Sequence, residues 1–378
     1  MEIRRLTNDK QDLSTFVKFP ASLYETNKQY VPPIVNLEVE RLLNEKSLER
    51  RNQFAYYMVF DNQKPLARVA AGMYKNLNQK SKHERGFLCY FDAVNNMEAA
   101  RMLLDAATED LKQRGANEIL LMNSTKFSQF GKGVLVNGDS LTDAAIFPYH
   151  FAYYKDLLES YGFVAYNKHD TYLVQAKDFP YERFMLLSEK AMQRFHYHIE
   201  SYVLNPSNID SLTDKVVSVI HQCYSSDWEI PQPSVYDVRT DMEEAMCFSN
   251  ANHLVFAYSD ERIVGVLFIY ANYHQRMQNY KGSLFPQYYL DRIVNSNTSK
   301  HYIAGMVFVV PDFQRKAVDL SMVCKAFTLA QNSGIETLEV FTIPTVTAQY
   351  ERAFTSIGGL KTKEYAQFIL KCAPDTVV

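Results

Sequence analysis

The sequence predicts an α/β fold, more closely an α+β mixed sheet, repeated in two successive halves. Short β-branched apolar runs alternate with helical patterns along the chain, and the order of elements in the first half recurs in the second. The length of 378 residues exceeds that of a usual single domain. We therefore expect two domains, 1–180 and 196–373, each a twisted sheet flanked by helices and packed together as one rigid body.

The first half is expected to open with a short strand, Glu2–Leu6, and helical segments within residues 1–50. Alternating apolar residues then predict strands, listed here in order: 56–60, 66–73, 86–93, 119–122 and 170–176. Helices are predicted at 99–111, where apolar residues recur at i, i+3 and i+4, and at 149–161. Gly115 and Gly162 follow these helices, as expected for residues that end them.

The second half is expected to repeat this order. The predicted strands are 198–203, 254–259, 263–270, 303–310 and 337–343, and the predicted helices are 209–224, 240–249 and one beginning near 318. The turn Asp260-Glu261-Arg262 joins the predicted strands 254–259 and 263–270 as a hairpin. This similar element order predicts a tandem duplication of architecture.

One stretch of the second half carries the clearest functional pattern. An apolar run ends at Pro311, a polar hexapeptide spans Gln314–Asp319, and a helical stripe begins at Val318 and ends before Gly334. Strand, loop, helix and strand form a βαβ unit with a right-handed crossover. The first amides of such a helix point at the mouth of the sheet, where an anion can bind.

The stretch VFVVPDFQRKAVDLSMVCKAF…SGIETLEVF resembles the acyl-CoA-binding core of the GNAT (Gcn5-related N-acetyltransferase) superfamily. That family carries Q/R-x-x-G-x-G/A between a strand and a helix, and the loop amides hold the coenzyme A pyrophosphate. Gln314 fits the motif, Ala317 replaces its first glycine and Asp319 its second small residue. A carboxylate beside a pyrophosphate is repelled unless it turns away or pairs with Arg315 or Lys316.

The first half resembles the N-terminal part of bacterial two-domain GNAT-like proteins of unassigned substrate. The matching residues include LYETNKQYVPP and FPYHFAYYKDLLESYGF. Its own strand-to-helix loop, Val94–Glu98, has no glycine and no basic residue. The pyrophosphate site is therefore expected in the second half.

The resemblance implies an acyl-CoA-dependent N-acyltransferase that uses acetyl-CoA or another acyl-CoA. The acceptor would be the amine of a small molecule or peptide, which attacks the thioester directly. The resemblance also implies a set of cofactor-binding residues: strand amides for the pantetheine arm, at Phe308, Val309 and Val310, and the loop residues Gln314, Arg315, Lys316, Ala317, Val318 and Asp319 for the pyrophosphate.

Two residues are candidates for proton transfer. In the family, the helix motif N-x-x-A-x-x-x-Y-x-x-x-G-F supplies a tyrosine that protonates the leaving thiolate, and Phe354 occupies that position here. Tyr350 lies one helical turn earlier and is the candidate substitute. Glu339, in the middle of a predicted strand, is the candidate general base, and Asp227 and Glu229 are alternatives. Each of these carboxylates could equally be a solvated surface charge.

Composition argues against several other classes of protein. The net charge is −3 with both signs interspersed, so no nucleic-acid-binding face is expected. Five dispersed cysteines without a C-x-x-C pair indicate reduced thiols, a cytoplasmic location and no metal site. No apolar run approaches the length of a membrane span, so no membrane association is expected.

Two alternative functions stay open at this point. Ala317, Asp319 and Phe354 would suit a non-catalytic GNAT-fold binding or scaffold protein whose cofactor site has decayed. A Fem-like aminoacyltransferase would also pair two GNAT domains but would take aminoacyl-tRNA. The near-neutral charge argues against the second alternative, because tRNA binding needs a basic groove.

Overall fold

A computed structural model describes most of the chain. It covers residues 1–74, 84–129, 132–138, 148–224, 231–249, 251–286, 299–341 and 347–372. At residues 128, 275 and 347–350 the description is limited to the backbone.

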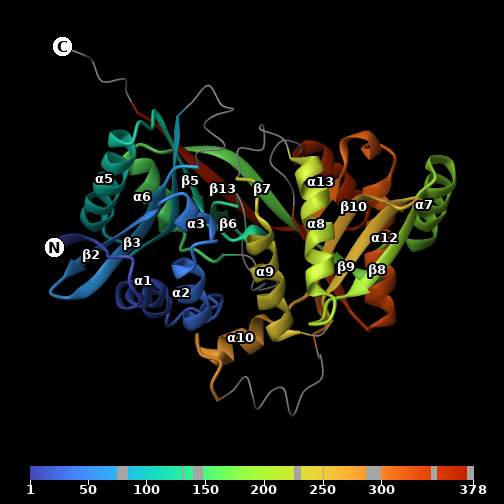
Figure 1. Ribbon diagram of the computed structural model, residues 1–378, viewed down its shortest axis with the longest axis horizontal. Coiled ribbons are helices and arrows are strands. Elements are labelled where there is room, and N and C mark those ends of the chain that lie inside the picture. Colours follow the sequence, from blue (N-terminus) through green and yellow to red (C-terminus); the bar gives the residue numbers. More distant parts are fainter. Residues whose placement is uncertain are drawn as a thin grey trace.

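The first half contains a meander of antiparallel strands followed by a parallel strand pair joined through a helix (Figure 1). Its strands are β1 (Glu2–Arg5), β2 (Ala55–Asp61), β3 (Lys64–Gly72), β4 (Arg85–Ala93), β5 (Glu118–Asn123), β6 (Val134–Asn137) and β7 (Val164–Gln175). Its helices are α1 (Lys10–Leu23), α2 (Val35–Leu43), α3 (Leu48–Arg51), α5 (Met97–Gln113), α6 (Tyr153–Tyr161) and the short η1 (Phe127–Gln129) and η2 (Ala176–Asp178).

The second half follows the same plan after the connecting helix α7 (Tyr181–Phe195). Its strands are β8 (His198–Val203), β9 (His253–Ser259), β10 (Arg262–Ala271), β11 (His301–Val309), β12 (Thr337–Phe341) and β13 (Leu360–Lys371). Its helices are α8 (Ile209–Cys223), α9 (Val235–Phe248), α10 (His274–Tyr280), η4 (Pro311–Phe313), α12 (Val318–Asn332) and α13 (Thr347–Ser356).

The two halves share one sheet. Within the described residues, its strands follow the order β1-β2-β3-β4-β5-β13-β7-β12-β11-β10-β9-β8, with β6 beside β13. β13, the last strand of the chain, lies between β5 and β7, while β7 of the first half pairs with β12 of the second. In Figure 1 the red β13 and the green β7 cross the centre of the molecule between the two sets of helices. Each half thus completes the sheet of the other.

The registers of the two halves match residue for residue. The parallel pairs β4–β5 and β11–β12 begin at Arg85↔Glu118 and at His301↔Thr337, and each continues for four consecutive pairs. On the other side, Ala67↔Ala93 corresponds to Gly265↔Val309. These equivalences, made by strand pairing rather than by residue identity, allow the two halves to be compared position by position.

Alternation along the strands divides the core of the first half between two faces. On β2, Tyr56 and Met58 face one cluster of buried residues, and Tyr57 and Val59 face the other. The second cluster lies under α5 and α6 and takes in Phe368 from β13. The first cluster runs on without interruption into the second half, which makes the two halves one packed unit.

The structure corrects several sequence-based expectations. Two separate sheets were expected, whereas the exchange of β7 and β13 produces one. β13 was not anticipated at all, because its alternation is obscured by buried polar residues such as Thr362 and Lys363. α9 begins at Val235 rather than 240, where Ser234 and Asp237 form a capping box. The start of α12 at Val318 and the left-handed Gly334 after it are as predicted.

None of the helices in the described segments is both long and apolar enough to span a bilayer.

The exchange predicts that the first half depends on the last strand of the chain. Phe368 is fully buried in the core under α5, so Phe368→Ala should lower the free energy of unfolding by about 3–5 kcal/mol. Leu360→Ala, at the exposed start of the same strand, should change it by less than about 0.5 kcal/mol. Urea denaturation monitored by circular dichroism measures both. Equal effects would contradict the placement of β13 in that core.

Candidate functional site

The described pairing of the parallel strands β11 and β12 ends at Ala304↔Val340, and β11 continues along β10 to Val309. The amide of Val310 donates to the carbonyl of Val264 on β10, with N···O 3.0 Å. Because amides alternate in direction along an antiparallel strand, those of Val307 and Val309 point away from β10. They point to the side of β11 on which β12 lies, beyond the last described pair of these two strands. Of the three amides expected to hold a pantetheine arm, Val309 has this direction, whereas Phe308 and Val310 face β10.

The loop after β11 reaches α12 through left-handed backbone. Arg315 has φ 62° and Ala317 has φ 58°, a conformation that glycine adopts most easily. This explains why Ala317, a small residue, stands where the related motif has glycine. The hydroxyl of Tyr197 donates to the carbonyls of Lys316 and Ala317, 3.2 and 3.1 Å away, and so holds the loop in this shape.

The N-terminus of α12 has no side-chain cap. Ala317 occupies the N-cap position and has no side chain to accept from the first-turn amides. The side chains of Gln314, Arg315 and Asp319 are exposed, and Nε2 of Gln314 donates to the Val309 carbonyl at 3.3 Å. Asp319 is stabilised by the positive end of the helix dipole, but it would repel any further anion that binds there.

The equivalent cleft of the first half is closed by the chain itself. Phe91 and Ala93 correspond to Val307 and Val309. The Phe91 amide donates to Oδ1 of Asn123 at 2.6 Å, and the Ala93 amide to the hydroxyl of Tyr154 at 3.1 Å. The side chain of Asn96 caps α5 by accepting from the Ala99 amide. These backbone donors are therefore already used, as expected from the loop that lacks glycine and basic residues.

Helices α6 and α13 occupy equivalent positions before the last strand of each half. Each is followed by a left-handed glycine, Gly162 with φ 119° and Gly358 with φ 79°. Aligning these glycines makes Tyr350 the counterpart of Tyr154, one turn before Phe354. Tyr350 lies within α13, but its side chain falls outside the described atoms. Asp227 and Glu229 also lie outside the described residues.

Glu339, the expected general base, is buried in the middle of the shared sheet. Its carboxylate forms an ion pair with Lys363 of β13, with N···O 2.9 Å, and its side chain is 3% exposed. Thr362 donates to the same carboxylate at 3.4 Å. Nearby, burial lowers the pKa of Lys132 to about 7, aided by Lys363 and opposed by Glu339. The centre of the shared sheet therefore contains one buried carboxylate, Glu339, and two buried lysine amines, Lys363 and Lys132.

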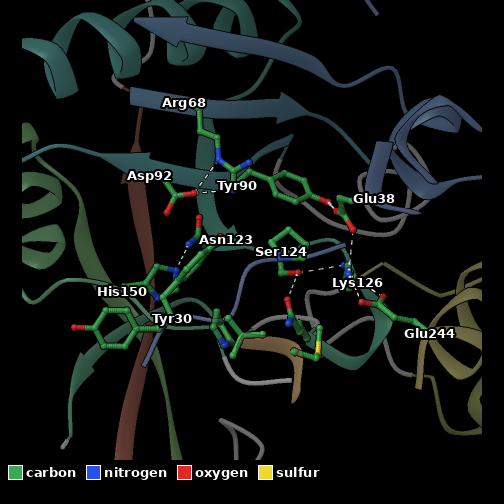
Figure 2. A pocket seen from close by; sticks show the side chains of 16 residues that line it. Tyr30, Glu38, Arg68, Tyr90, Asp92, Asn123, Ser124, Lys126, His150 and Glu244 are labelled. Atoms are coloured by element: carbon green, nitrogen blue, oxygen red, sulfur yellow. Dashed lines mark hydrogen bonds and ion pairs between the residues drawn. The ribbon is translucent and has the colours of Figure 1, made fainter. Parts of the chain in front are cut away.

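A polar cavity of about 140 Å³ lies at the end of β4 and β5, between the two halves (Figure 2). Most of its wall belongs to the first half, and Glu244 of α9 and Met277 of α10 close it from the second. Its charged side chains contact partners of opposite charge. Arg68 Nε donates to Asp92 at 2.8 Å, and Lys126 contacts Glu38 at 3.0 Å and Glu244 at 2.9 Å.

The charges around this cavity stabilise one another. Burial would raise the pKa of Glu38, but Arg41 and Lys126 outweigh it and hold that pKa well below its usual range. Burial, together with the positive charge of Arg68, lowers the pKa of His150 to about 3, so this imidazole is neutral near pH 7. Its Nδ1 accepts from the Leu135 amide at 3.0 Å.

Sequence reasoning did not find this cavity. Its residues come from positions as distant as Tyr30 and Met277, and no local motif connects them. The one available signal was Arg68 and Asp92, two opposite charges in otherwise apolar strands. In the described residues no cluster of three or more histidine, cysteine or acidic side chains could hold a metal ion.

Comparison with known proteins gives no matching family profile. A relative by sequence is Protein YghO of Escherichia coli K12, 23% identical over 155 residues, which span 41% of this chain and 40% of that protein.

Solved structures match over nearly the whole chain. A tandem GNAT protein from the clavulanic acid biosynthesis pathway matches with TM-score 0.51 and 9% identity over 99% of both chains. A GCN5-related glucosamine N-acetyltransferase region of a fungal multi-domain enzyme matches with TM-score 0.55 and 15% identity, over 98% of this chain and 38% of that one. A probable N-acyltransferase from Enterococcus faecalis V583 matches with TM-score 0.52 and 8% identity, over 97% and 72%. With the duplicated strand registers, these matches show that the chain has the tandem GNAT fold.

Proposed function

We propose that the chain is an N-acyltransferase that takes an acyl group from acetyl-CoA or a longer acyl-CoA. The acceptor is the amine of a small molecule or a peptide, with no part for nucleic acid, and the setting is cytoplasmic. Segments 1–180 and 196–373 are the two GNAT-like units, and the second binds the acyl-CoA.

The direction of the strand amides at the end of β11 carries this proposal. Two of them, Val307 and Val309, point away from β10, and no described residue of β12 pairs with them. The equivalent donors in the first half are taken by Asn123 and Tyr154. A pantetheine arm carries amide groups that can bond to such a strand edge.

The loop 314–319 fits a pyrophosphate in shape and in most of its charge. The left-handed Arg315 and Ala317 turn the chain into an uncapped helix N-terminus, where phosphate oxygens bind backbone amides. Arg315 and Lys316 supply positive charge beside it. Asp319 opposes them, so we expect a site that binds, but more weakly than one with a small residue at position 319.

The apolar side chains near the cleft suit an acyl group. The first-half pair Arg68↔Asp92 corresponds to Val266↔Phe308, so the second half has apolar residues where the first has an ion pair. The Phe308 ring stacks on Phe127 of η1, with centroids 6.3 Å apart. An acyl chain entering beside β11 would therefore meet apolar surface.

Two residues remain candidates for proton transfer. Bound acyl-CoA supplies the activated carbonyl. Tyr350 is proposed to donate its hydroxyl proton to the departing thiolate, because its counterpart Tyr154 places a hydroxyl 3.1 Å from the amide equivalent to that of Val309. Glu339 is kept as the proposed base, but its ion pair with Lys363 must loosen before it can accept a proton.

Isothermal titration calorimetry of the full chain with acetyl-CoA and longer acyl-CoAs tests the proposal directly. Saturable heat that is lost in the Ala317→Val variant is expected, because a β-branched residue does not tolerate φ 58° at the loop. No heat with any acyl-CoA would remove the transferase and favour the non-catalytic alternative.

Removing the negative charge at position 319 should strengthen acyl-CoA binding. Asp319→Asn is expected to lower the Kd for acetyl-CoA by about three- to tenfold at low salt, because it ends repulsion of the pyrophosphate. Asp260→Asn is the matched control, since its exposed carboxylate lies in a left-handed turn that asparagine also accepts. A weaker or unchanged affinity for the 319 variant would contradict a pyrophosphate at this loop.

Tyr350→Phe should separate chemistry from binding. We expect the rate of CoA thiol release in the presence of a primary-amine mixture to fall by about 10²-fold or more, because the proton donor is lost. The Kd for acetyl-CoA from calorimetry should stay the same. Tyr161→Phe, in the first-half helix α6, serves as the control and should keep the parent rate. A parent-like rate for the 350 variant would exclude Tyr350 as the donor.

A further inference from the structure

The two halves have diverged at the same structural position. At the face of the sheet beside each strand pair, the second half has Val266 and Phe308, and the first half has Arg68 and Asp92. Next to the closed cleft, the first half forms most of the wall of the polar cavity of about 140 Å³ (Figure 2). The polar cavity therefore lies beside the first-half counterpart of the proposed acyl-CoA cleft.

The wall of this cavity carries more negative than positive charges. Three carboxylates, Glu38, Asp92 and Glu244, face two cations, Arg68 and Lys126, which leaves one negative charge in excess. Just outside the wall, Arg41 contacts both Glu38, at 2.8 Å, and the buried Glu49, so these two further residues add one charge of each sign and leave the balance unchanged. Lys126 is shared between two carboxylates, and Arg68 is held by one. Neither cation is free to receive an anionic ligand.

The remaining walls favour an organic cation over a bare ion. Tyrosine rings from three separate segments, Tyr30, Tyr90 and Tyr149, line the cavity. A tyrosine ring attracts a positive charge that lies over its face, as Arg68 lies over the Tyr90 ring, 5.6 Å from its centroid. A cavity of ~150 Å³ can hold a six-membered ring, so the ligand has on the order of five to eight non-hydrogen atoms.

We propose that the cavity between the two halves binds a small primary amine as its ammonium ion. The ammonium donates to the carboxylates of the wall, and its carbon chain packs on the tyrosine rings. Because Glu244 belongs to α9 of the second half and Arg68 and Asp92 to the first, the bound amine contacts both halves. This site is distinct from the acyl-CoA cleft, and its occupancy does not depend on the proposed transferase activity.

Calorimetry of the full chain with three probes of equal length tests the charge of the ligand. n-Butylamine should bind saturably, and n-butanol and butyrate should bind at least about tenfold more weakly, because the cavity has an excess carboxylate. Equal binding of the alcohol, stronger binding of butyrate, or no saturable binding of the amine would each overturn the proposal.

A pair of neighbouring glutamates tests the location. Glu244→Gln removes one carboxylate of the wall and leaves Lys126 paired with Glu38, so butylamine affinity should fall by about tenfold. Glu243→Gln is the matched control, because Glu243 is exposed on the same helix and pairs with Arg239. Equal losses in both variants would overturn the location. The acetyl-CoA titration of both variants should match the parent, which separates this result from a failure of the transferase proposal.

Discussion

The central antiparallel pair β7–β13 is the constraint on which the rest of this molecule depends. Each strand ends one half of the chain but borders the sheet of the other half, β7 on β12 and β13 on β5. Neither half can satisfy the backbone of its central edge alone, and an unpaired edge strand is costly to bury. The two halves therefore have one fixed arrangement. The cavity between them depends on this arrangement for its shape.

A buried ion pair at this centre specifies the order of the exchanged strands. Lys363 of β13 reaches across β7 to Glu339 of β12, and Thr362 and Thr171 bond to each other at 2.7 Å beside them. Desolvation of two charges offsets much of their attraction, so such a pair adds little net stability. Its effect is on specificity, because Lys363 finds a carboxylate only when β13, β7 and β12 lie in this order.

Local chemistry in the sequence was sufficient to predict the loop around 311–319, and it was insufficient for the arrangement of the strands. Pro311, the polar hexapeptide and Gly334 act on their own neighbours, so the start of α12 and its left-handed end could be predicted. Strand partners are chosen by distant pairing, and β13 carries buried polar residues that break its alternation. The cavity could not be predicted for the same reason. Arg68 and Asp92 are neighbours only because β3 and β4 pair, and Glu244 belongs to the second half of the chain.

The two halves combine matching strand registers with opposite side-chain chemistry. The backbone donors at Phe91 and Ala93 point in the same direction as those at Val307 and Val309, because amides alternate along equivalent strands. In the first half, Asn123 and Tyr154 accept from these donors, and Arg68 and Asp92 form an ion pair on the neighbouring strands. In the second half, Val266 and Phe308 take the positions of that ion pair, and the described residues provide no partner for the donors. A few side chains on closely similar strand registers therefore distinguish the two halves.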